Sequence, residues 1–82
     1  MIRMGKESNL VPSDVVEKAI AFFGPSGAGL NVVDRGDCCA RFEAAGGYVF
    51  VQTADIDDRG GSNVTVEGRE WEYQIKQFMR EI

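Results

Sequence analysis

Apolar residues are spaced in two ways along the chain, and the spacing separates strand-like from helix-like segments. The most apolar run is Tyr48-Val49-Phe50-Val51, whose aromatic and β-branched residues predict a strand over 48–53. Because successive side chains of a strand point to opposite faces, two residues of this run must lie on each face of the sheet. Helices can cover one of these faces, so the apolar residues on the other face need a separate explanation.

Two further segments repeat their apolar residues at the spacing of an amphipathic helix. The first, over 12–23, begins with the typical helix-start residues Pro12, Ser13 and Asp14 and ends before Gly24-Pro25. The second is expected over 69–82. Each helix has one apolar stripe to bury, made of Val16, Ala19, Ile20 and Phe23 in the first and of Trp71, Ile75, Phe78, Met79 and Ile82 in the second.

Shorter runs predict further strands over 30–34, 38–44 and 64–67. The turn at Gly46-Gly47 decides which face of the strand 48–53 meets the helices, because a shift of one residue reverses every side chain. An even loop turns Val49 and Val51 toward the helices, whereas an odd loop turns Tyr48 and Phe50 there. The sequence leaves both alternatives open and favours the even loop, since valines pack well beneath helices and a tyrosine hydroxyl prefers the wetter side.

The order of these elements predicts an α+β fold. We expect a two-layer sandwich in which a four-stranded antiparallel meander carries two helices on one face, in the order α-β-β-β-β-α. Residues 11–82 should form this single domain, preceded by a segment, 1–10, that is either poorly ordered or a short edge strand. The layout is similar to that of helix-grip and TATA-binding-protein-like domains, but no residue motif accompanies the likeness, so it carries no function.

The composition disfavours several classes of function. The chain has 82 residues, 9 of them basic and 13 acidic, and no run of Lys or Arg, so nucleic acid and anionic membranes are disfavoured partners. It contains no histidine, which removes imidazole-based catalysis and His-ligated zinc. We expect no cofactor. Because no apolar stretch is long enough to cross a membrane and no signal peptide is recognisable, we expect a cytoplasmic protein.

The cysteines Cys38 and Cys39 are adjacent, so they cannot build the disulfide framework of a small secreted domain, which fits a reducing compartment. On a strand their side chains diverge, and we expect Cys38 in the core and Cys39 on the outer face beside Arg41. A thiol-based enzyme that uses Cys39, with Arg41 favouring the thiolate, is the least favoured of three functional hypotheses.

The acidic stretch 54–63 is expected to be a long connection between strands. Its residues Asp55, Asp57 and Gly60 match positions 1, 3 and 6 of a calcium-binding loop, but Arg59 and Val66 stand where ligands belong. We therefore predict no metal site, and a charged loop that protects the sheet edge from pairing.

The favoured hypothesis follows from the face that the helices leave open. Aromatic residues mixed with arginine and polar groups are typical of protein interfaces. We expect a small binding or assembly module, without catalytic activity, that self-associates or docks on a partner protein through Tyr48, Phe50, Arg41, Gln52 and Cys39. The alternative is a small-ligand site in a groove between the sheet and the C-terminal helix, formed by Trp71, Tyr73 and Arg41.

Overall fold

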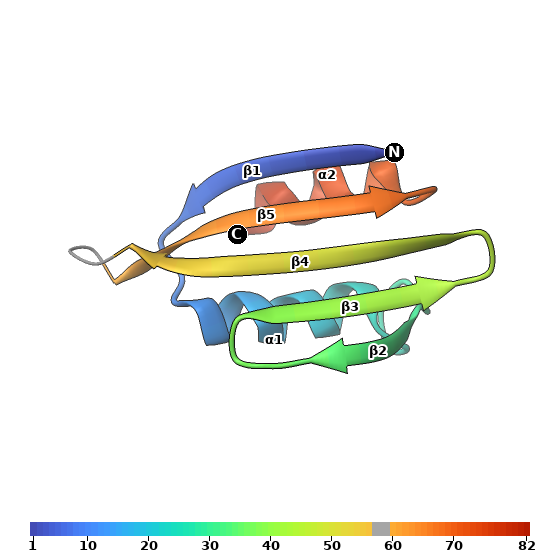
Figure 1. Cartoon of the computed structure of the whole chain (residues 1–82), viewed down its shortest axis with the longest axis horizontal. Coiled ribbons are helices and arrows are strands. Elements are labelled where there is room, and N and C mark those ends of the chain that lie inside the picture. The colour runs from blue at the N-terminus through green and yellow to red at the C-terminus, as the bar shows by residue number, and fades with distance from the viewer. Residues whose placement is uncertain (57–59) are drawn as a thin grey trace.

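The computed structural model describes residues 1–56 and 60–82, which form one antiparallel sheet and two helices. In chain order the elements are β1 (Ile2–Ser8), α1 (Pro12–Phe23), β2 (Asn31–Arg35), β3 (Cys39–Ala44), β4 (Gly47–Ile56), β5 (Gly61–Arg69) and α2 (Glu72–Glu81). The strand order across the sheet is β1-β5-β4-β3-β2, and both helices lie behind it in the view of Figure 1. The predicted α+β class with an antiparallel sheet is confirmed.

The predicted count of four strands, and with it the order α-β-β-β-β-α, is wrong. The described residues contain a fifth strand, β1, at the edge of the sheet, which is the second of the two alternatives for residues 1–10 and pairs with β5 from Ile2↔Gly68 to Ser8↔Ser62. Its local pattern is weak, because Ile2 and Met4 are followed by a glycine and a lysine. What holds β1 in place is a ladder to a segment far away in the sequence, and a local pattern does not report that ladder.

The helix α1 has the predicted bounds, 12–23, with proline at its start and its end closed by hydrogen bonds from the following loop. The helix α2 begins later than the predicted residue 69. The strand β5 continues to Arg69, and Glu70 then takes a left-handed conformation with φ of 76°, which breaks any continuous helix there. The chain turns sharply at this point and α2 starts at Glu72.

The turn between β3 and β4 is the even alternative. Ala44 pairs with Gly47, and the register places Phe42 opposite Val49. Gly46 supplies the left-handed conformation of the turn, with φ of 85°. The valines of β4 therefore face the helices and are fully buried, and Tyr48 and Phe50 lie on the other face.

The core lies between the sheet and the helices. Phe23 of α1 is its centre, because its ring centroid lies 5.5 Å from that of Phe42 in β3 and 5.1 Å from that of Phe78 in α2. Burying aromatic rings of this size supplies a large share of the stabilisation available to so short a chain. The other fully buried apolar residues of the described chain are Val15, Val16, Ala19, Leu30, Ala40, Val49, Val51, Val64, Val66 and Ile75.

The predicted connection 54–63 is mostly strand. The strand β4 runs to Ile56 and β5 starts at Gly61, so the two form a long hairpin that projects at the left of Figure 1. Residues 57–59 lie outside the described part of the chain. The comparison of Asp55, Asp57 and Arg59 with a calcium loop therefore rests partly on residues outside the described ranges.

Candidate binding face of the sheet

The sheet face opposite the helices is here called the open face, and two of the rows of residues that cross it carry its aromatic side chains. The register makes each row continuous, because directly paired residues of antiparallel strands point to the same face. The phenylalanine row reads Asp34, Arg41, Phe50, Glu67 and Arg3 from β2 to β1. The tyrosine row reads Asn31, Glu43, Tyr48 and Arg69 from β2 to β5.

An arginine stacked on two aromatic rings forms the centre of the open face. The guanidinium carbon of Arg41 lies 4.8 Å from the centroid of the Tyr48 ring and 5.9 Å from that of Phe50. Both distances are within the range of cation–π attraction. Arg41 Nε also donates to Glu43 Oε2 at 3.0 Å. These contacts hold three large side chains in a defined arrangement, although no helix covers them.

Tyr48 is held from the other side by β5. Its hydroxyl donates a hydrogen bond to Glu67 Oε2 at 2.8 Å. This bond, with smaller contributions from burial and from the charge of Glu67, raises the pKa of Tyr48 above its usual value, while Arg41 and Arg69 act in the opposite direction. The phenol is therefore a neutral donor at physiological pH, and Glu67 is the acceptor that orients it.

The rest of the open face is polar and of mixed charge. Arg3 approaches Glu67 at 3.7 Å, with both side chains partly in solvent. Beside Arg41 and Tyr48 there is a shallow hollow of about 270 Å³ that Arg69 also lines. The basic residues at described positions of this face are arginines, whereas Lys6, Lys18 and Lys76 lie on the helix side. Protein interfaces show the same preference for arginine over lysine.

The structure places the five residues predicted for the interface together on the open face. Tyr48, Phe50 and Arg41 form its centre, and Cys39 and Gln52 are paired in the next row. The sequence analysis missed Glu67, Arg69, Arg3 and Asp34. The sequence does contain a signal for Glu67 and Arg69. If Val64 and Val66 point toward the helices, the alternation of a strand turns residues 67 and 69 to the other face.

The residues of the alternative ligand site do not come together. Trp71 packs against the core on the helix side, beneath Gly47, and its Nε1 is buried without a hydrogen-bond partner. Tyr73 is 71% exposed on α2. Arg41 lies on the opposite face of the sheet from both. A groove that combines Trp71, Tyr73 and Arg41 is therefore not formed.

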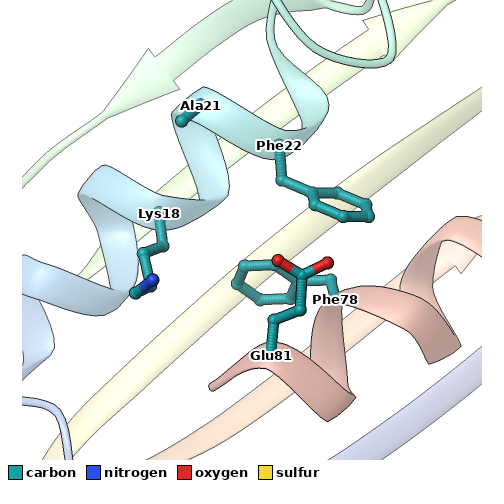
Figure 2. A pocket seen from close by; sticks show the side chains of 5 residues that line it. All are labelled: Lys18, Ala21, Phe22, Phe78 and Glu81. Atoms are coloured by element: carbon teal, nitrogen blue, oxygen red, sulfur yellow. The ribbon is translucent and has the colours of Figure 1, made fainter.

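The helix side does contain hollows, in places that the sequence analysis did not predict. One, of about 220 Å³, lies between α1 and α2 and is lined by Lys18, Ala21, Phe22, Phe78 and Glu81, with the two phenylalanine rings close together and tilted by 56° (Figure 2). The ring centroids are 5.6 Å apart. A neighbouring hollow of about 390 Å³ shares Ala21 and Phe22 and adds Trp71.

The expectation that Cys38 is a core residue and that Cys39 is a free thiol is wrong. The two cysteines form a disulfide with each other, and Cys38 is exposed at the turn before β3. The bond holds the two side chains together, so they cannot alternate between faces as they would in a regular strand. Both backbone N–H and hydroxyl of Thr53 donate to the carbonyl of Cys38, each at 2.8 Å, and fix this turn to β4.

In residues 1–56 and 60–82, no group of three or more acidic, cysteine or histidine side chains could hold a metal ion. Neither helix of this part of the chain is long and apolar enough to cross a membrane. Searches of protein-family models, curated proteins and solved structures find no match to this chain.

Proposed function

We propose that this chain is a small cytoplasmic binding or assembly module, without catalytic activity, that docks on a protein surface through the open face of its sheet. The observation that carries the proposal is the arrangement of Arg41 over the rings of Tyr48 and Phe50 on a face that neither helix covers. Tyrosine and arginine are enriched among the residues that dominate binding energy in protein interfaces.

The same contacts reduce the cost of binding. Ordering a flexible side chain at an interface costs about 0.5–1.5 kcal/mol. Arg41 and Tyr48 are already held by Glu43 and Glu67, so a partner meets them in a fixed geometry. Mixed charge on the open face favours a protein partner over nucleic acid, which requires a basic surface.

The proposed cytoplasmic location rests on composition. The disulfide joins adjacent residues and closes no loop, so it is not the kind of framework that stabilises small secreted domains.

A photoreactive phenylalanine analogue at position 50 tests the proposal in cells that produce the protein. Irradiation is expected to give covalent protein adducts from position 50 that disappear when the same chain also carries Arg41→Glu. The matched control has the analogue at position 73, an exposed aromatic position on α2, and is expected to give none. Adducts from both positions alike, or none from position 50, would show that the open face is not a binding surface.

A second candidate function is binding of a small apolar ligand in the hollows between α1 and α2. The neighbouring rings of Phe22 and Phe78 favour it, because binding pockets are lined mostly by apolar and aromatic side chains. Anilinonaphthalene sulfonate is a suitable probe, since Trp71 is the single tryptophan and lines the adjacent hollow. Energy transfer from Trp71 to the bound dye that is lost in Ala21→Leu, whose larger side chain narrows both hollows, would support this function, and no binding would eliminate it.

A further inference from the structure

Within the phenylalanine and tyrosine rows, charged positions equally far from β4 on its two sides have opposite signs. On the side of β3 and β2, the phenylalanine row contains the negative Asp34 and the positive Arg41. The tyrosine row contains the negative Glu43 on this side. The positions equally far from β4 on the other side have the opposite charge. The positive Arg3 corresponds to Asp34, the negative Glu67 to Arg41, and the positive Arg69 to Glu43. The strand between them contributes only uncharged side chains to these rows, Phe50 and Tyr48.

A twofold axis that runs parallel to β4, between two facing sheets, relates these positions. Rotation about this axis keeps a residue's position along the strands and reverses its position across the sheet. A residue one strand to one side of β4 therefore faces the partner's residue in the same row, one strand to the other side of the partner's β4. Arg41 then faces the partner's Glu67, and Asp34 faces the partner's Arg3. Glu43 faces the partner's Arg69, while Phe50 meets the partner's Phe50 on the axis. Every charge in both rows is matched by an opposite charge.

We propose that the partner of the open face is a second copy of this chain, packed face to face about this axis. The inference rests on the proposed function and names the occupant of that site. An isologous interface must be self-complementary, because each residue meets the surface to which it belongs. The opposite signs across β4 meet this requirement for both rows.

Ion pairing within one chain does not account for the relationship. The pairs Arg41–Glu43 and Arg3–Glu67 require opposite charges on the same side of β4. Across β4, the signs of Arg41 and Glu67 are related through Tyr48 instead, since its ring stacks with Arg41 and its hydroxyl donates to Glu67. Exchanging the signs on one side alone would preserve the ion pairs within the chain, but it would remove one of the two Tyr48 contacts and abolish the complementarity between copies.

The size of the open face also suits a dimer. Strands β1 to β5, at about 4.8 Å spacing and about 3.3 Å per residue over roughly seven residues, give a flat outline of about 550 Å². Side-chain relief increases the accessible area toward the roughly 800 Å² per partner of a standard interface. Sheets that stack with nearly aligned strands lie about 10 Å apart, which leaves room for one layer of aromatic and arginine side chains from each copy.

Charge exchange between two variants tests the axis. Arg41→Glu places like charges opposite the partner's Glu67 at two symmetric contacts, and Glu67→Arg does the same against the partner's Arg41. Each variant alone is expected to weaken dimerisation at least about 100-fold. An equimolar mixture restores opposite charges at both contacts, so native mass spectrometry should show a dimer with one copy of each variant and twice the 9.0 kDa chain mass.

The controls separate this inference from the proposed function. Glu72→Lys and Lys76→Glu, on the exposed side of α2, should leave the dimer unchanged, and thermal unfolding should show that all variants fold. A wild-type mass of 9.0 kDa at every concentration overturns the inference, although adducts from position 50 to another protein would still support the proposed function. If Glu43→Arg, and not Glu67→Arg, restores the dimer when mixed with Arg41→Glu, the twofold axis runs across the strands. That result would also overturn the inference.

Discussion

The hydroxyl of Tyr48 on β4 donates to the carboxylate of Glu67 on β5 at 2.8 Å, across the centre of the open face. This bond is the first cause of the raised pKa of Tyr48, ahead of burial and of the charge of Glu67. A group whose pKa is raised on folding stabilises the fold below its unfolded pKa of 10.0 and loses that contribution as the pH rises through the higher folded value.

We therefore predict that Tyr48 ionises above the usual pH for tyrosine, and that Glu67→Gln lowers its pKa. The measurement is alkaline titration of tyrosinate absorbance in a Tyr73→Phe background, which leaves Tyr48 as the remaining one of the two tyrosines. The amide that Glu67→Gln introduces can still accept the hydrogen bond, so the difference reports mainly the charge. An unchanged titration curve in that variant would contradict the predicted contribution of the charge of Glu67.

The start of β4 tolerates no side chain. A Cβ on Gly47 would overlap the carbonyl oxygen of Arg69 and lie 2.9 Å from Glu70 Cβ and 3.0 Å from Trp71 Nε1. Because a backbone carbonyl cannot move aside, we predict that Gly47→Ala lowers the free energy of unfolding by about 1–3 kcal/mol. Gly36→Ala is the matched control in the neighbouring hairpin, where a Cβ would meet nothing within 4 Å. Equal urea midpoints for the two variants would refute this account of Gly47.

Local signals in the sequence are sufficient for α1, and for β4 they favour the observed orientation without excluding the other. The helix has a proline start, an apolar stripe and a Gly-Pro end, all of which act within a few residues. The orientation of β4 is favoured by the residues of the strand itself. A register shift of one residue would turn Phe50 toward the helices in place of Val51, and it would also bring the hydroxyl of Tyr48 into the core.

The features that the sequence left open or missed depend on long-range pairing. The strand β1 is defined by its ladder to β5, and the late start of α2 by the pairing of Arg69 with Tyr48, which keeps that residue in the sheet. The residues of the open face likewise divide into those that a local pattern predicts and those that depend on pairing between strands. Alternation along single strands predicts Tyr48, Phe50 and Arg41, whereas Arg3 and Asp34 enter the rows only through the register between strands.

The disulfide between Cys38 and Cys39 is predicted to contribute little to stability. A disulfide acts mainly by closing a loop in the unfolded chain, and the sequence separation here is 1, so almost no chain entropy is removed. Cys38→Ser with Cys39→Ser should change the free energy of unfolding by less than about 1 kcal/mol, within the usual range for surface substitutions. Urea unfolding of the double variant measures this, and Thr53→Val, which removes the hydroxyl bond to Cys38, provides a comparison in the same turn. A larger loss in the cysteine variant than in Thr53→Val would mean that the bond itself holds the turn.

Lys6 connects the edge strand to the end of α2, because its Nζ donates to the carbonyl oxygen of Met79 at 2.8 Å. That carbonyl belongs to the last turn of the helix, where carbonyl groups lack intrahelical partners and a positive charge is favourable. We predict that Lys6→Met, which keeps the apolar stem, lowers the free energy of unfolding by about 0.5–1.5 kcal/mol and speeds amide exchange in the last turn of α2 and in β1. Lys18→Met on α1 is the control, since Lys18 makes no hydrogen bond or ion pair with any described residue. If both variants exchange alike at the end of α2, the lysine does not act as its cap and β1 is held by its ladder to β5 alone.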